Sequence, residues 1–404
     1  MSALFSTRAE MVNAFEALAA KHYEMLSVDR RLQWRKNLLK TYIVEVDRIP
    51  DAELGECLRR MIASAWPSHS VMPTDDASLF QILGSDASFM VDMVADRFWL
   101  FHSVDAADVA DAAVLGTLVQ TAAADSMWLP SDFLHDLLAV EVPRGFSTSF
   151  DSDYFRRRSW GEYEGSWRYA GPSDEEADEL DTLEDEAPLE TLSLRMSGTQ
   201  ASLMLEAVES VEDLRQHLTV SRAKIRHGEE STALVEVGFD GRALCRGPDY
   251  LQYIDLLRRI LDPYSRWLQR VASDCTFRVL GEGPRGLSLD GEPIVIKFPQ
   301  PVPQAEAFYA RLLSGARPFR LWGKPERQSE GYWSGTVCDL HGGGVLRMDL
   351  GEEYIRVYLQ DGCCANTVLR LVTNLQRAFS SQMEMRAAGE DLMLRYLGDR
   401  SDVY

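Results

Sequence analysis

The first half of the chain carries apolar residues at a spacing close to 3.6, the period of a helix that buries one face. Residues 9–26 show this spacing through Met11, Phe15 and Leu26, and later segments repeat it or are rich in small helix-forming residues. The predicted helices cover residues 9–26, 29–46, 51–65, 88–102, 106–124 and 131–140. This pattern predicts an all-α bundle of about six helices over residues 1–146.

The second half changes its period and mixes short alternating stretches with helical ones. The predicted strands are 192–194, 202–206, 222–226, 234–238, 287–289, 294–298, 319–322, 335–340, 345–350 and 354–359. The predicted helices are 211–218, 250–271, 305–313, 366–379 and 383–397. The order of elements in 192–275 recurs in part in 276–404, so we expect an α+β region with a possible internal duplication of ββαββα-type units. Chance similarity of the two parts is the alternative.

A dense run of acidic residues separates the two halves. Ten carboxylates fall between Asp174 and Glu190, with no Lys or Arg among them. Like charges repel at this density, and the run has too little apolar surface to offset the entropy of ordering it. The composition predicts an exposed acidic linker over residues 172–191, which is also a natural target for a protease.

An arm rich in aromatic and arginine residues, 147–171, lies between the predicted bundle and the acidic run. Aromatic rings beside arginine are typical of recognition surfaces. The candidate binding residues are Tyr154, Phe155, Arg156, Arg157, Arg158, Trp160 and Trp167. The alternative is an arm or strand pair that packs on the bundle.

Composition and charge narrow the class of protein. A chain of 404 residues with 46% hydrophobic residues suggests two or three domains. The formal net charge of −21 disfavours nucleic acid and membrane surfaces as main ligands, and is more compatible with a protein partner of basic or mixed surface. The first ten residues do not resemble a secretion signal, so we expect none, and no apolar run approaches about 18 residues. The six cysteines do not resemble a disulfide framework, so we expect reduced thiols and a cytoplasmic protein without a cofactor.

Four residues near the end of the chain form the best candidate for chemistry: Cys338, His341, Cys363 and Cys364. If the strands after residue 335 form a meander, His341 and Cys364 lie at the same edge of the sheet. Cys364 with His341 would make a nucleophile and base, with Asp361 or Asp339 orienting the base. The same four side chains are also candidate zinc ligands. The third alternative is buried thiols beside a glycine-rich hairpin, since the first and third strands of a meander lie about 10 Å apart.

The chain contains no Gly-x-Ser-x-Gly elbow, no Walker loop and no Rossmann glycine fingerprint. We therefore expect a non-enzymatic protein-interaction or regulatory adaptor whose halves are joined by the acidic linker, with cleavage there as a possible control. The alternatives are a cysteine-dependent hydrolase or transferase, and a small-molecule sensor that binds between the duplicated units.

Overall fold

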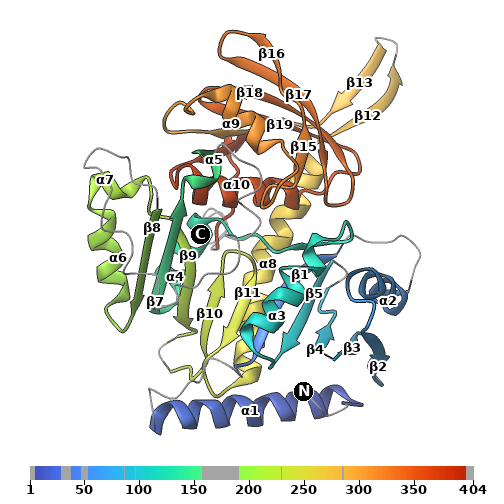
Figure 1. Ribbon diagram of the computed structural model, residues 1–404, viewed down its shortest axis with the longest axis vertical. Coiled ribbons are helices and arrows are strands. Elements are labelled where there is room, and N and C mark those ends of the chain that lie inside the picture. Colours follow the sequence, from blue (N-terminus) through green and yellow to red (C-terminus); the bar gives the residue numbers. More distant parts are fainter. Residues whose placement is uncertain are drawn as a thin grey trace.

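The computed structural model describes residues 5–28, 38–46, 53–85, 87–95, 97–156, 191–228, 230–283 and 286–396. Two large and mainly antiparallel β-sheets dominate this part of the chain, with helices spread along the sequence (Figure 1). The predicted all-α bundle at the N-terminus is therefore wrong.

The first sheet has the strand order β2-β3-β4-β5-β1-β11-β10-β9-β7-β8, and β6 also pairs with β1. Its strands are β1 (Lys40–Val46), β2 (Ser70–Pro73), β3 (Leu79–Leu83), β4 (Ser88–Asp92), β5 (Phe98–Ser103), β6 (Ala124–Ser126), β7 (Val142–Asp151), β8 (Thr191–Ser197), β9 (Val220–Arg226), β10 (Leu234–Gly238) and β11 (Arg242–Cys245). Strands from both sides of the acidic run share this sheet, because β7 pairs with β8 and β1 pairs with β11. The run thus lies in the connection between two neighbouring strands.

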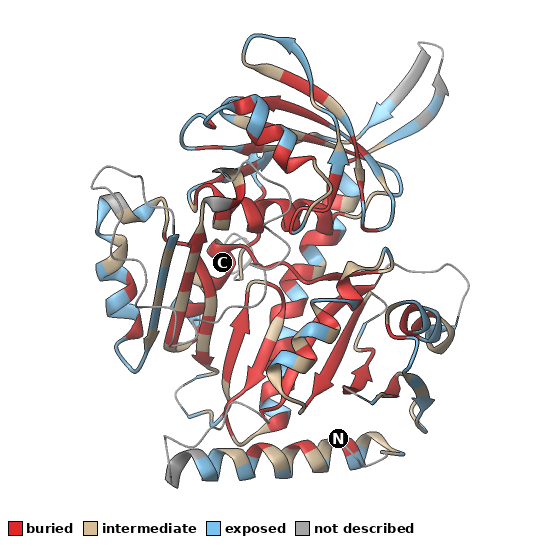
Figure 2. Cartoon of the chain, in the orientation of Figure 1, coloured by how far each residue is buried: buried red, intermediate tan, exposed pale blue. Residues whose placement is uncertain are grey.

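Helices cover parts of both faces of the first sheet. They are α1 (Arg8–Val28), α2 (Leu54–Ala65), α3 (Ala107–Val114), α4 (Ser131–Val140), α5 (Asp153–Arg156), α6 (Ala201–Glu209), α7 (Glu212–Arg215) and α8 (Tyr250–Asp274), with the short 3-10 turn η2 (Leu118–Gln120). Ile43 of β1 packs into the core that contains α8, whereas Tyr42 and Val44 pack into a second core with α2. The central strands are consequently buried on both faces (Figure 2).

Burial on both faces explains why helices were predicted where strands occur. All seven residues of β1 are buried, so the strand shows no alternation of polar and apolar positions. The predicted helix 29–46 is strand β1 over most of its described part, and the predicted helix 88–102 is the strand pair β4 and β5. The predicted helix 106–124 is helical only in α3, which is followed by the turn η2 and the start of strand β6. The predicted helices 9–26 and 131–140 are confirmed as α1 and α4, and the predicted helix 51–65 is confirmed as α2, which begins at Leu54.

The second sheet has the order β15-β17-β18-β19-β14-β20-β21, and β12, β13 and β16 join it off this path. Its strands are β12 (Thr276–Gly283), β13 (Gly286–Asp290), β14 (Ile294–Lys297), β15 (Leu321–Gly323), β16 (Glu326–Ser329), β17 (Tyr332–Asp339), β18 (Val345–Gly351), β19 (Tyr354–Gln360), β20 (Glu384–Ala387) and β21 (Glu390–Asp391). Two helices accompany it, α9 (Ala305–Leu312) and α10 (Asn366–Ala378). The predicted meander is confirmed as β17, β18 and β19.

The predicted duplication of ββαββα-type units is wrong. The strands of 192–275 lie in the first sheet, whereas those of 276–404 lie in the second. The predicted strand 202–206 belongs to α6, where Ala201 and Leu205 are buried one helical turn apart and Leu203 is exposed. The predicted helix 383–397 contains β20 and β21 instead.

Helix α10 lies at the junction of the two sheets and is buried on nearly every side (Figures 1 and 2). A helix buried all round is expected to be apolar, yet α10 carries Arg370, whose side chain has no exposed surface. None of the helices in the described ranges is both long and apolar enough for a membrane span.

One buried histidine of the first sheet predicts a pH dependence of stability. His102 of β5 is fully buried, and its Nδ1 shares a hydrogen bond of 2.8 Å with Thr41 Oγ1. Burial lowers the pKa of His102 to about 4, below the ordinary value of 6.5. The unfolded chain therefore binds this proton more tightly, and stability falls as the pH drops from about 6.5 to about 4.

We expect the His102 contribution to the free energy of unfolding to fall by about 3 kcal/mol over that pH range. Urea unfolding at a series of pH values should show this loss in the wild type and not in His102→Gln. His135 is a matched control, because Glu209 raises its pKa and His135→Gln should change the pH profile with the opposite sign. Parallel pH profiles for the wild type and His102→Gln would contradict the prediction.

Candidate functional site

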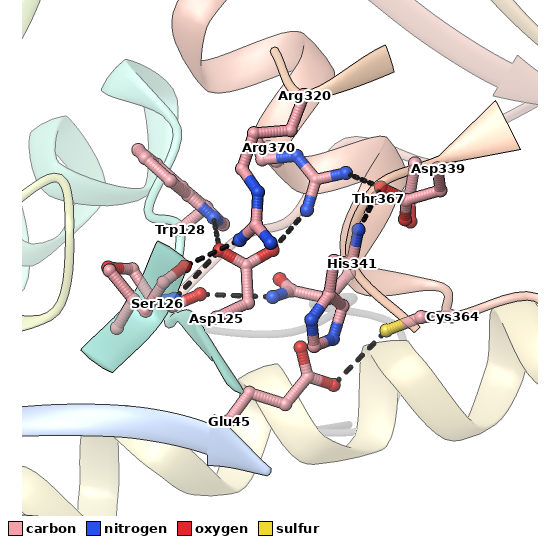
Figure 3. A network of polar contacts seen from close by, with 12 residues as sticks. Glu45, Asp125, Ser126, Trp128, Arg320, Asp339, His341, Cys364, Thr367 and Arg370 are labelled. Atoms are coloured by element: carbon pink, nitrogen blue, oxygen red, sulfur yellow. Dashed lines mark hydrogen bonds and ion pairs between the residues drawn. The ribbon is translucent and has the colours of Figure 1, made fainter. Parts of the chain in front are cut away.

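Three side chains from distant parts of the sequence meet where the two sheets join. Glu45 lies on β1, His341 in the turn after β17, and Cys364 directly before α10 (Figure 3). Each offers one potential metal-ligand atom, and these atoms all lie within 4.8 Å of one another. We call these three residues the junction cluster.

The turn between β17 and β18 brings His341 to the first sheet. The backbone N–H of His341 donates to Asp339 Oδ1 at 3.0 Å. The backbone N–H of Gly342 then donates to the carbonyl of Ala122 at 2.9 Å, which ties the turn to the segment before β6. Gly342 and Gly343 have φ angles of 71° and 72°, a conformation that favours glycine. The glycine-rich sequence therefore serves to turn the chain tightly against the first sheet.

Cys364 is placed by the turn that leads from β19 into α10. Its sulfur accepts a hydrogen bond from Arg97 Nη2 at 2.9 Å and lies 3.4 Å from Glu45 Oε1. Arg97 also forms an ion pair with Glu45. The carboxylate and the sulfur thus share one guanidinium group. The Arg97 side chain is 37% exposed, whereas that of Glu45 is 1% exposed, so Arg97 reaches from the buried carboxylate to the solvent.

The electrostatics of the junction cluster favour a neutral thiol. Burial raises the pKa of Cys364 well above its usual value, and the carboxylate of Glu45 raises it further, while Arg97 acts against both. Glu45 and Cys364 in turn keep the pKa of Arg97 raised although burial acts in the opposite direction. A cysteine nucleophile requires a lowered pKa, so this environment does not suit the predicted pairing of Cys364 with a His341 base.

Two polar atoms of the junction cluster are buried without a hydrogen-bond partner. They are Oε2 of Glu45 and Nδ1 of His341, and each residue is at most 1% exposed. An unsatisfied polar atom in the interior costs about 1–3 kcal/mol. Both atoms can offer a lone pair when the imidazole is in the matching tautomer, so a cation bound through these two atoms would satisfy both.

The combination of ligand types indicates which cation fits. A thiol, an imidazole and a carboxylate are a mixed set typical of zinc, whereas magnesium and calcium prefer oxygen ligands alone. With metal–ligand bonds of about 2.0–2.3 Å, ligand atoms around tetrahedral zinc lie about 3.5 Å apart. The observed separations of up to 4.8 Å therefore require side-chain shifts of about 1 Å.

A buried ionic network lies beside the junction cluster. Arg370 of α10 forms ion pairs with Asp125 of β6 and with Asp339 of β17 (Figure 3). Its Nε donates to the carbonyl of Phe319 at 2.9 Å, and the Thr367 hydroxyl donates to Asp339. One helix residue therefore bonds a strand from each sheet.

The network holds its charges in spite of deep burial. Burial alone would raise the pKa of Asp125, but Arg370 holds that pKa below its usual range, helped by His341, Arg320 and the indole of Trp128. The indole N–H of Trp128 donates to Asp125 Oδ1 at 2.9 Å. Because Asp339 also receives the His341 backbone N–H, the network fixes the position of the turn that carries His341.

The other predicted chemical residues lie apart from the junction cluster. Cys363 Sγ donates to the carbonyl of Val345 at 3.1 Å, and Cys338 Sγ lies 3.7 Å from the carbonyl of Asp339. The Asp361 side chain is 83% exposed and lies 3.9 Å from Arg278. The structure thus brings His341 and Cys364 together and separates them from Asp361.

The described part of the aromatic arm is packed into the protein. Tyr154 is fully buried, and the Phe155 ring stacks on Phe308 with ring centroids 4.0 Å apart. These two rings serve as packing contacts. Arg156 ends α5, and the predicted binding residues Arg157, Arg158, Trp160 and Trp167 lie outside the described residues.

Sequence reasoning missed Glu45, Arg97, Asp125 and Arg370. A signal existed for three of them, because Glu45 is a single carboxylate within the apolar stretch of β1, Asp125 directly follows three alanines, and Arg370 stands between two leucines in α10. Charged residues are almost never fully buried unless they are paired. Arg97 carries no such signal, since it stands directly after another charged residue, Asp96.

The Arg370 network predicts a large loss of stability when the guanidinium is removed. Arg370→Met leaves Asp125 and Asp339 buried without their cation, so the free energy of unfolding should fall by about 3–5 kcal/mol. Urea unfolding followed by circular dichroism measures the loss. The control is Arg259→Met, which removes an exposed pair with Asp255 at 2.8 Å and should change stability by less than about 1 kcal/mol. Similar losses in both variants would contradict the assigned role.

Comparisons with known proteins give a family and no activity. The uncharacterized protein MJECL33 of Methanocaldococcus jannaschii is 20% identical over 407 residues, covering 95% of each chain. No solved structure matches this chain. The model of the MJECL33-like protein family matches residues 1–393, and the chain therefore belongs to that family.

Proposed function

We propose that this protein is a regulatory protein that binds one divalent transition-metal ion, with zinc as the best match, in the junction cluster. The observation that carries the proposal is that ligand atoms of Glu45, His341 and Cys364 lie within 4.8 Å of one another, in a cluster where the buried atoms Glu45 Oε2 and His341 Nδ1 lack a hydrogen-bond partner. An ion bound there would link β1 of the first sheet to the second sheet and α10, so its gain or loss would change how firmly the two sheets are joined.

A regulatory role is better supported than cysteine-based catalysis. Burial and Glu45 raise the pKa of the Cys364 thiol, which opposes nucleophilic attack. A metal ion changes this balance, because a coordinating thiol is deprotonated by the ion itself. The same three residues therefore suit metal binding and do not suit an unassisted nucleophile.

The wider setting that we propose is a cytoplasmic regulatory adaptor. The described cysteines are all free, which agrees with a reducing compartment. The net charge of −21 favours a protein partner with a basic or mixed surface over nucleic acid. Control by cleavage in the acidic run 172–191 remains part of this proposal, and those residues up to 190 lie outside the described ranges.

Metal binding is tested on the full-length protein after treatment with a chelator. We expect one Co²⁺ per chain with the intense visible absorption of a tetrahedral ion and a near-ultraviolet thiolate-to-cobalt band, and we expect Zn²⁺ to displace it. Zn²⁺ at about 1,000 times its dissociation constant should stabilise the fold by about 4 kcal/mol. Absence of stoichiometric binding would overturn the proposal.

The matched controls come from adjacent cysteines. Cys364→Ser should weaken Co²⁺ binding by more than about 100-fold and abolish the charge-transfer band, because loss of a direct ligand exceeds the 10- to 100-fold effect of supporting residues. Cys363→Ser changes the neighbouring thiol, which points to the Val345 carbonyl, and should bind as the wild type does. An equal effect of both substitutions would contradict the assignment of Cys364.

A further inference from the structure

We infer that the metal ion in the junction cluster keeps one open coordination position, and that this position together with Arg97 binds a small carboxylate anion. The inference rests on the proposed function and names the ligand class of the same site. It makes the site a sensor of a small molecule in addition to a link between the sheets.

The number of ligands leaves room for an added group. Within the described ranges, the junction cluster offers three ligand residues, Glu45, His341 and Cys364. Zinc prefers four ligands, and sites with three protein ligands keep the fourth position for water or an exogenous ligand. These three residues therefore do not form a closed structural site, which would have four protein ligands.

Arg97 lies between the solvent and two of the candidate ligands, Glu45 and Cys364. Its Nη2 lies 2.9 Å from the Cys364 sulfur, and the guanidinium also pairs with Oε1 of Glu45. Glu45 and His341 are at most 1% exposed, whereas the Arg97 side chain is 37% exposed. Arg97 therefore reaches from the ligand atoms to the solvent.

The arginine retains capacity for a ligand. Nε and Nη2 donate to the junction cluster, and Nη1 makes no hydrogen bond to any described residue. Nη1 can therefore donate a charge-assisted hydrogen bond to one oxygen of a carboxylate while Nε and Nη2 keep their bonds to the cluster. One oxygen of a small carboxylate on the ion and the other on Arg97 would satisfy both groups together.

The charges indicate a monoanion. Before metal binding, the carboxylate of Glu45 and the guanidinium of Arg97 balance each other. A divalent ion with a bound thiolate then leaves one positive charge in excess. The neighbouring network does not compensate it, because Asp125 and Asp339 are matched by Arg370 and Arg320. A monocarboxylate supplies one negative charge, whereas a phosphate group carries about two.

The test uses the full-length protein loaded with Co²⁺, so that the metal is observed separately from the anion. Acetate is the probe, titrated at constant ionic strength in sodium perchlorate, and inorganic phosphate is the comparison anion. The visible cobalt spectrum should change saturably with acetate. In Arg97→Met the acetate affinity should be about 10- to 100-fold weaker, the value expected for losing hydrogen bonds to a charged group.

The controls separate a ligand site from general effects. Arg60→Met removes an exposed arginine of α2 that pairs with Glu56, and its acetate titration should match the wild type. If Arg97→Met does not fold, Arg97→Lys replaces it. Lysine keeps the charge but has one terminal nitrogen, which cannot replace Nε, Nη2 and Nη1 together, so acetate should bind less tightly than in the wild type.

Three outcomes would overturn the inference while leaving metal binding in place. They are an unchanged cobalt spectrum with acetate, equal acetate affinity without Arg97, and tighter binding of phosphate than of acetate. Failure to bind Co²⁺ at all is a different result, since it overturns the proposed function and removes the basis of the inference with it.

Discussion

The buried guanidinium of Arg370 is the interaction on which the arrangement of the two sheets depends. It pairs with Asp125 of the first sheet and Asp339 of the second, in a helix that has no exposed face at this point. Taking three charges out of water is costly, and the cost is repaid only while all partners are present. The contact is therefore sensitive to geometry: it favours one relative position of the sheets over others.

Neutral hydrogen bonds extend this connection along the junction. The amide of Asn366 donates to the carbonyl of Ser126 at 3.0 Å and accepts from the hydroxyl of Tyr264. That hydroxyl accepts from the backbone N–H of Trp128 at 3.0 Å. Helices α8 and α10 and the segment after β6 are thus joined through polar atoms that are all satisfied, as buried polar networks require. The rigid junction then holds Glu45, His341 and Cys364 at the separations that make them a site.

The junction cluster differs from this network in one respect, because two of its buried atoms lack partners. Glu45 Oε2 and His341 Nδ1 are two of several buried polar atoms without a partner in the described residues, and they belong to side chains whose ligand atoms meet within 4.8 Å. Unsatisfied buried polar atoms in native proteins require an explanation, and a bound ion is one of the recognised explanations. Arg97 is bonded to the candidate ligands and is partly exposed, so it could bind a small anion from solvent next to a metal ion. Metal binding and ligand sensing are therefore proposed for one site.

The sequence by itself determined α1, α2, α4, α8 and the meander of β17, β18 and β19, whose apolar residues follow one face, and also α10, which is buried on nearly every side. It also singled out His341 and Cys364, because in a meander the turn after β17, which holds His341, and the end of β19, which Cys364 follows, lie at the same edge of the sheet. Tertiary structure alone decided that residues 40–46 and 88–103 form central strands, since burial on both faces removes the alternation by which strands are recognised. It alone decided that Glu45 and Arg97 complete the site, because side chains hundreds of residues apart become neighbours only through the packing of the two sheets.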